Sequence, residues 1–234
     1  SFRALRAEYW KRVEETDGTH HKWIGRTTPW KGPETFLRAS RALSALRWTV
    51  TMEGLDTSPA FIPIRKNFTF NAALNRDPST HVIEQNGLPT LFGPYKNTEM
   101  LERMSRVGFG YALTKLKPQY VHRSLEYAQA EIPAVGAIPV YTAEHGRNCL
   151  HRVTGDPLIC SPNSYTIWLD EEFTEEQIDT LKTLSRDSVA RDEWREGAFK
   201  FYESHQDVEP VFEELLSKIE YHVQNTSRHD HRRK

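Results

Sequence analysis

The chain has 234 residues, and its 31 Lys and Arg residues are balanced by 32 Asp and Glu residues, so its formal net charge at pH 7 is −1. That balance excludes a global attraction to nucleic acid or to an anionic membrane, and any polyanion site must be a local patch. Two cysteines are too few for a disulfide framework, which favours a reducing, cytoplasmic compartment. The apolar stretches are much shorter than the roughly 20 residues that span a bilayer, so we expect no membrane insertion.

In the first half of the chain, the helical spacing of apolar residues predicts a first helix that ends before Asp17. Residues 19–32 lack this spacing and are expected to be irregular. A second helix is predicted from Pro33 to about Arg47, because proline suits the first helical turn. Trp48–Met52 alternates large apolar residues with Thr, which predicts a half-buried strand. Prolines between residues 58 and 94 leave room for short strands only, expected at Phe61–Ile64, Phe68–Phe70 and His81–Glu84.

In the second half, Asn97 suits the N-cap of a helix that Gly108 and Gly110 are expected to end. Another helix is predicted to begin at Pro118, as proline is favoured at the first helical position. Short apolar runs bounded by polar and turn residues then predict strands. They are expected at Ile138–Thr142, Leu158–Cys160 and Tyr165–Leu169.

The sharpest local signal lies at residues 173–178. Thr174 and Gln177 have the spacing of a capping box, and Phe173 and Ile178 that of a hydrophobic staple, so a helix is expected to begin there. We expect this helix to continue toward Trp194, with a break near Gly197 and a final helix carrying apolar residues from 211 to 223. Residues 225–234 are basic, contain no apolar residue and are expected to be disordered.

These elements predict an α/β (mixed α+β) fold. We expect a single globular domain over residues 1–224, with a small mixed sheet, flanking helices and a helical C-terminal third. Several catalytic motifs are absent, namely the G-x4-G-K-[ST] phosphate loop, the G-x-S-x-G elbow and the H-E-x-x-H zinc pair. Gly108-Phe109-Gly110 begins a dinucleotide-like pattern, but Leu113 replaces its third glycine.

The densest polar cluster follows the predicted strand 138–142. A strand that runs into a glycine turn and then a helix exposes backbone N–H groups, and flanking arginines add bidentate contacts to an anion. Histidine titrates near neutral pH and suits proton transfer, and a neighbouring carboxylate can orient it. The candidate phosphate-binding residues are Gly146, Arg147, Asn148 and Arg152, and the candidate catalytic residues are His145, His151 and Glu144.

Two other interpretations of this segment stay open. The first is an ordinary surface turn whose arginines pair with nearby carboxylates. The second is a zinc site, because cysteine and histidine side chains suit zinc, although their spacing matches no standard ligand pair. Its ligands would be His145, Cys149, His151 and Cys160. A divalent metal, Mg or Zn, is therefore a candidate cofactor.

The run from Pro118 to Pro162, which includes AIPVYTAEHGRNCLHRVTGDPLICSP, resembles the core of the superfamily of ParB chromosome-partitioning proteins and sulfiredoxins. In that superfamily a strand leads to a glycine turn with basic residues at the start of a helix. The resemblance implies that Gly146, Arg147, Asn148 and Arg152 bind the phosphate of a nucleotide or of DNA.

Two functional hypotheses follow from the sequence. The first is a nucleic-acid-associated protein, a nuclease or nucleotide hydrolase, whose phosphate-binding loop covers residues 144–152. Its partners would be nucleic acid or a nucleotide. The alternative is a non-enzymatic interaction or regulatory protein that forms homo-oligomers through its C-terminal helices.

Overall fold

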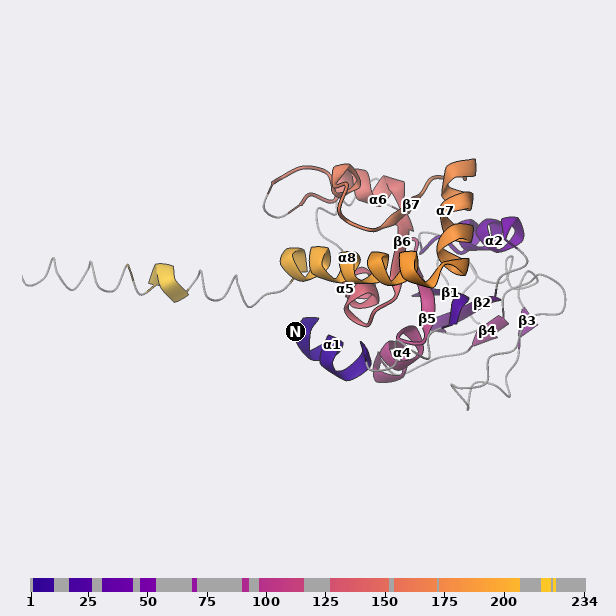
Figure 1. Cartoon of the computed structure of the whole chain (residues 1–234), viewed down its shortest axis with the longest axis horizontal. Coiled ribbons are helices and arrows are strands. Elements are labelled where there is room, and N and C mark those ends of the chain that lie inside the picture. Colours follow the sequence, from indigo (N-terminus) through magenta and orange to yellow (C-terminus); the bar gives the residue numbers. More distant parts are fainter. Residues whose placement is uncertain are drawn as a thin grey trace, which may run out of the picture.

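A seven-stranded sheet forms the centre of the computed structural model (Figure 1). The structure describes residues 2–10, 17–26, 31–43, 47–53, 69–70, 90–92, 97–115, 127–151, 154–171, 173–206, 216–219 and 221. The spatial order is β3-β4-β2-β1-β5-β6-β7, and every pairing among these strands is parallel. The strands are β1 Asp17–Arg26, β2 Arg47–Glu53, β3 Thr69–Phe70, β4 Thr90–Phe92, β5 Val107–Ala112, β6 Ile138–Thr142 and β7 Ile167–Leu169.

Helices cover both faces of this sheet, as Figure 1 shows. One apolar cluster joins one face to α2 and α7, and a second cluster joins the other face to α1, α4, α5 and α8. The helices are α1 Phe2–Tyr9, α2 Pro33–Ala42, α4 Asn97–Met104, α5 Tyr127–Ala134, α6 Ala143–Asn148, α7 Glu175–Arg186 and α8 Ser188–Gln206, with a 3-10 turn at Leu158–Cys160.

The expected α/β class, flanking helices and helical C-terminal third are confirmed. The sheet has as many strands as the sequence predicts but not all at the expected positions, and its described pairings are all parallel where a small mixed sheet was expected. Parallel strands need helical crossovers, which explains why the helices lie on both faces. The domain limits at residues 1 and 224 stay predictions. The expected strands 61–64 and 81–84, the helix start at Pro118 and the basic tail lie outside the described residues.

Strand β1 is central, although the expectation for residues 19–32 was irregular structure. His21 is fully buried and its ring stacks on Phe109 of β5 at 4.2 Å between centroids. Its Nδ1 lies 2.8 Å from the Tyr111 hydroxyl, and its Nε2 lies 3.2 Å from Oγ of Ser185 on α7. The prediction was wrong because partners distant in sequence satisfy this polar strand, and buried polar groups are tolerated when they are hydrogen-bonded.

Strand β5 was also missed, because Gly108 and Gly110 were expected to end a helix. Every residue of β5 is buried. A Cβ at Gly110 would lie 2.7 Å from Ile132 of α5 and 2.8 Å from Met104 of α4, so the glycine lets both helices approach the strand closely. The aromatic residues Phe109 and Tyr111 alternate with these glycines, which is the period of a strand.

Helix α7 begins where the sequence predicts. Thr174 Oγ1 accepts a hydrogen bond from Gln177 N at 3.2 Å, and Gln177 Oε1 accepts one from Thr174 N at 3.2 Å, so both halves of the capping box form. The expected continuation to Trp194 and break at Gly197 are wrong. The helix instead ends before Asp187, and α8 begins directly after it. The Asp187 carboxylate accepts a hydrogen bond from the backbone N–H of Val189 in the first turn of α8. Gly197 lies inside α8, where the ring of Tyr165 occupies the space of a Cβ.

Replacing Thr174 with Ala removes the hydroxyl that accepts from the third helical N–H. We expect the free energy of unfolding to fall by about 1 kcal/mol, the usual cost of losing an N-cap. Chemical denaturation of the variant and the parent protein measures the difference. An unchanged unfolding midpoint would contradict this account of how α7 begins.

Candidate functional site

The direction of the strands indicates where a ligand binds. The chain passes from β1 to β2 on one side of the sheet, whereas β5, β6 and β7 lie on the other side of β1. In open parallel sheets, ligands bind outside the carboxyl ends of the strands, at the point where the strand order reverses. This point lies between β1 and β5, so the residues that follow β5, β6 and β7 are candidates for a site.

A polar pocket lies at this edge, with a cavity volume of about 40 Å³. It is open to solvent, and polar or charged side chains provide all but one of its lining residues. The lining residues are Thr35, Lys115, Thr142, Glu144, Arg147, Leu169, Asp170 and Glu171. Most of them follow a strand of the sheet within a few positions, so the pocket is a product of the fold's topology.

Two ion pairs cross the pocket region. Lys115 Nζ lies 3.1 Å from Glu171 Oε1, and Arg147 Nη2 lies 3.1 Å from Asp170 Oδ1. The hydrogen bond and charge of Lys115 lower the pKa of the Glu171 carboxyl below its ordinary value. The Glu171 side chain is 78% exposed and that of Arg147 is 57% exposed. Ion pairs this exposed contribute little to stability because solvent and salt screen them, so Lys115 and Arg147 remain accessible to an anionic ligand.

The first turn of α2 also reaches the pocket through Thr35, which is buried. Gly32 precedes this helix with φ +67°, and a Cβ there would lie 2.3 Å from the Leu113 carbonyl oxygen. Only glycine permits this conformation and this approach, which holds the start of α2 against the end of β5. The free N–H groups and positive dipole of a helix N-terminus favour an anion. Among the described residues that line the pocket, Lys115 and Arg147 carry positive charge, and this helix end adds to them.

The predicted site residues separate in the structure. Glu144 and Arg147 line the pocket, as α6 follows β6 directly. His145 is fully buried and lies outside the pocket lining. Gly146 lies within α6 rather than in a turn, and a Cβ there would lie 2.7 Å from the Trp168 ring. Asn148 Nδ2 donates to the Glu144 carbonyl oxygen at 2.8 Å.

His151 is directed elsewhere. Its ring lies 5.4 Å from Phe201 and 5.3 Å from His205, both on α8, and its Nδ1 accepts from Thr154 N at 3.2 Å. Arg152 lies outside the described residues. The structure thus brings Glu144 and Arg147 together and does not place His151 with them. The catalytic and phosphate-binding roles assigned from the sequence stay predictions.

Two observations bear on the zinc interpretation. Cys149 is buried and Cys160 is exposed. Among the residues that the structure describes, no three His, Cys, Asp or Glu side chains converge on a metal site.

Sequence reasoning missed Lys115, Asp170 and Glu171. Each lies within three residues of the carboxyl end of a strand, β5 for the lysine and β7 for the two acidic residues. That position is itself a signal in a parallel sheet. It was not visible from the sequence, because β5 was taken for the end of a helix and the strand order was unknown.

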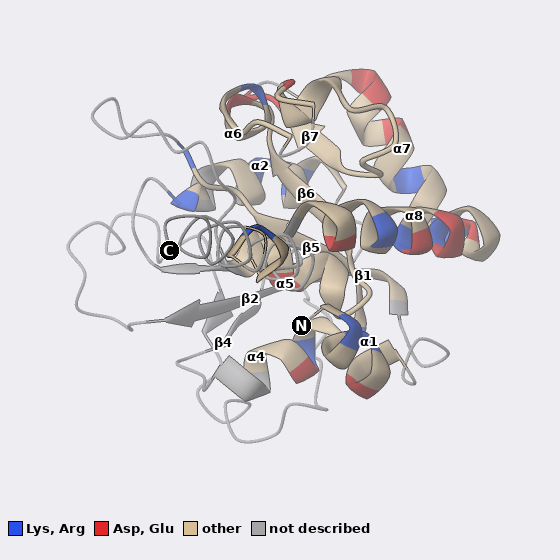
Figure 2. Cartoon of the chain, turned by 90° about the vertical axis from the view of Figure 1, so that its left-hand side faces the viewer, with Lys and Arg blue, Asp and Glu red and all other residues tan. Residues whose placement is uncertain are grey.

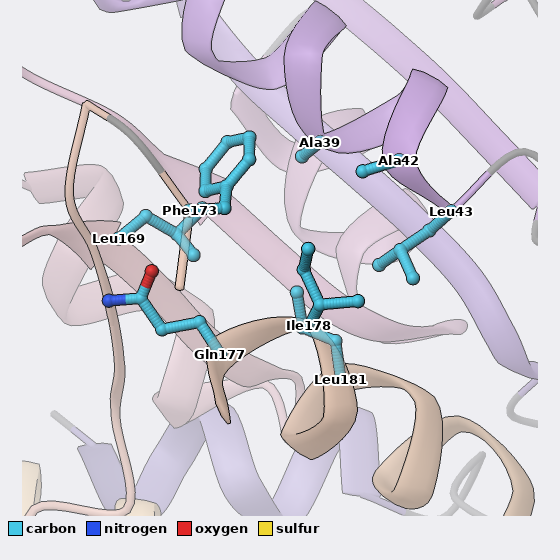
Figure 3. Close-up of a pocket in the computed structure, with 8 residues that line it drawn as sticks. All are labelled: Ala39, Ala42, Leu43, Leu169, Phe173, Gln177, Ile178 and Leu181. Carbon is cyan, nitrogen blue, oxygen red and sulfur yellow. The ribbon is translucent and has the colours of Figure 1, made fainter. Parts of the chain in front are cut away.

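A second pocket, between α2 and α7, is apolar apart from Gln177 (Figure 3). It is a shallow depression with no room for a water molecule inside it, and its other side chains include Leu43, Phe173, Ile178 and Leu181. It has no group that would bind an anion. Figure 2 shows residues of both charge signs on α6 and along α8, so positive charge is local, as the overall balance predicts. In the described part of the chain, no helix has the length and apolar content needed to cross a membrane.

Comparison with known proteins decides the family. The model of the family described as DNA alpha-glucosyltransferase matches residues 2–189. A DNA alpha-glucosyltransferase of Enterobacteria phage T4 is 41% identical over 217 residues, which are 92% of this chain and 54% of that protein. The chain belongs to the DNA alpha-glucosyltransferase family. It spans about half the length of the curated relative that it matches.

Solved structures agree with this assignment. An alpha-glucosyltransferase in complex with UDP-glucose and DNA containing an abasic site is 38% identical, with a TM-score of 0.81 over 94% of this chain and 56% of that one. Another, in complex with UDP and a 13-mer DNA containing a central A:G mismatch, is 38% identical, with a TM-score of 0.80. The alignment covers 93% of this chain and 58% of that one. Anabaena HepE in complex with UDP is 10% identical, with a TM-score of 0.56 over 93% of this chain and 53% of that one. At this identity the similarity shows the fold only.

Family membership corrects two expectations. The resemblance to ParB proteins and sulfiredoxins is wrong, because the family match extends over residues 2–189 whereas that resemblance rested on one short segment. The expectation of a nuclease or nucleotide hydrolase is also wrong, since the family is one of transferases. A strand followed by basic residues at a helix start occurs in many phosphate-binding folds, so the segment carried too little information to separate them.

Proposed function

We propose that this chain is part of, or constitutes, an enzyme that transfers glucose from UDP-glucose to DNA. The observation that carries the proposal is the 41% identity to a phage T4 DNA alpha-glucosyltransferase over 92% of the chain. Relatives that are 38% identical and align with more than nine-tenths of the chain were solved with UDP, UDP-glucose and DNA. The residues that match the family model include those at the carboxyl edge of the sheet, where the polar pocket lies.

Within this function, we assign the polar pocket to the diphosphate of the nucleotide sugar. Transfer breaks the bond between the anomeric carbon and the β-phosphate oxygen, and the electron pair remains on UDP. A hydroxyl oxygen of the DNA forms the new bond to that carbon, and its proton leaves to a base. Positive groups placed where this negative charge develops stabilise the transition state. Lys115, Arg147 and the first turn of α2 provide such groups at one place.

A transfer assay tests the proposal directly. The full chain is incubated with UDP-glucose labelled in the sugar and with DNA that contains an HMU base, as in one solved relative. A matched duplex without that base is the control for the acceptor, and release of free glucose without DNA measures hydrolysis. We expect label in the DNA and little free glucose. Binding of UDP-glucose without any label in either DNA would contradict transfer, and free glucose alone would indicate hydrolysis instead.

A further inference from the structure

Gln177 does more than begin α7. Its Oε1 accepts from Thr174 N at 3.2 Å, as the capping box requires. Its Nε2 donates in two other directions, to the Trp168 carbonyl oxygen at 2.7 Å and to Asp170 Oδ2 at 3.3 Å. Figure 3 shows its amide beside Leu169, the last residue of β7. Because both ends of the amide have assigned partners, its orientation is determined by the hydrogen bonds around it.

The contact with Asp170 links Gln177 to the polar pocket. Asp170 Oδ2 accepts from Gln177, and Asp170 Oδ1 accepts from Arg147 Nη2 at 3.1 Å. Both carboxylate oxygens are engaged from different sides, so the plane of the carboxylate follows the position of the glutamine amide. A planar guanidinium is sensitive to the orientation of the carboxylate that it contacts. The position of Arg147 therefore depends on Gln177, although the two side chains do not contact each other directly.

The backbone segments that carry these contacts are closely packed, so they have little room to move relative to one another. Gly146 of α6 lies against Trp168 of β7, where a Cβ would be 2.7 Å from the ring. The carbonyl of the same Trp168 accepts from Gln177. Helix α6, the end of β7 and the start of α7 are thus joined at one corner. Arg147 projects from this corner and lines the polar pocket.

We infer that Gln177 is a positioning residue for nucleotide-sugar binding: it orients Asp170 and, through Asp170, Arg147 at the phosphate pocket. This inference rests on the proposed function, because it needs the pocket to bind UDP-glucose. A structural role limited to the helix cap predicts instead that only stability depends on Gln177. Glutamate separates the two roles, since its carboxylate oxygen still accepts from Thr174 N but cannot donate to Trp168 or Asp170. It also places a second negative charge beside Asp170.

The first test compares Gln177→Glu with Thr174→Ala. For Gln177→Glu we expect the KM for UDP-glucose to rise on the order of 5- to 10-fold, as is usual for coupled neighbours, with kcat changed by less than about twofold. Thr174→Ala should lower the unfolding midpoint and leave the KM unchanged, because the donations from Gln177 Nε2 remain. Equal KM values for the parent protein and Gln177→Glu would overturn the inference, as would an increase of the same size for Thr174→Ala.

The second test repeats the substitution in the Arg147→Ala background. If Gln177 acts through Arg147, adding Gln177→Glu there should raise the KM by less than about twofold. The same 5- to 10-fold increase in both backgrounds would overturn the inference. A measurement on the ligand-free protein tests the positioning role separately from the proposed function. The NMR signal of the Arg147 Nε–H, identified by its loss in Arg147→Ala, should shift in Gln177→Glu and stay in place in Thr174→Ala. A shift without any UDP-glucose binding would refute the proposed function alone, whereas an unmoved signal would refute the positioning role.

Discussion

Replacing Lys115 and Arg147 together with Ala is expected to raise the dissociation constant for UDP-glucose about 100-fold or more, because each charge-assisted hydrogen bond contributes about 1.5–3 kcal/mol. The two side chains line the same pocket from different strand ends. Glu171 is largely exposed, and the Arg147–Asp170 pair is partly exposed on both sides, so the fold loses little when the ion pairs are removed. Calorimetric titration with UDP-glucose and with UDP measures the effect, and both ligands should lose affinity equally because they share the diphosphate.

A matched control is Lys182→Ala. Lys182 also forms an exposed ion pair, with Asp179 at 3.4 Å on α7, but it does not line the pocket. It should bind UDP-glucose like the parent protein. If the double variant keeps its affinity within about threefold while it remains folded, the assignment of the pocket to the diphosphate is wrong.

Replacing Gly32 with Ala is expected to have the largest effect on stability. A non-glycine residue in the left-handed region costs about 1–2 kcal/mol. The added Cβ would also lie 2.3 Å from the Leu113 carbonyl oxygen, which belongs to the backbone and cannot rotate away. Overpacking of this kind costs a further 1–3 kcal/mol, so we expect the free energy of unfolding to fall by roughly 2–5 kcal/mol.

Gly155→Ala separates these two contributions. Gly155 also has positive φ, +76°, but no atom lies within 4 Å of its Cβ position. In urea denaturation, Gly155→Ala should lose only the conformational contribution to the free energy of unfolding, about 1–2 kcal/mol. Gly32→Ala should in addition weaken UDP-glucose binding, because relief of the contact moves the first turn of α2 away from the pocket. Equal losses of stability in the two variants would contradict the close approach of Gly32 to β5.

Local signals predicted some elements well. The start of α7 depends on hydrogen bonds between residues three apart, and Thr174 and Gln177 carry that information themselves. Strand β6 was also predicted with its observed bounds. By contrast, Leu158–Cys160 was expected to be a strand and forms a 3-10 turn, because a three-residue apolar run does not distinguish the two.

Only part of the candidate site could be predicted from local sequence signals. Glu144 and Arg147 were recognised because they belong to one dense polar segment. Lys115 and Asp170 are far from that segment in sequence, and nothing local indicates that they approach it. They meet because β5, β6 and β7 are adjacent and parallel, so the residues after each strand gather at one edge.

By itself, then, the amino-acid order determined where α2, α4 and α7 begin, the α/β class and one polar segment, since capping and periodicity act over a few residues. The tertiary structure decided that a polar stretch with His21 becomes the central strand, because Tyr111 and Ser185 supply its hydrogen bonds from other elements. It also decided which charges share a pocket. Both outcomes depend on contacts between residues tens of positions apart, and the free energy of such contacts exists only once the sheet has formed.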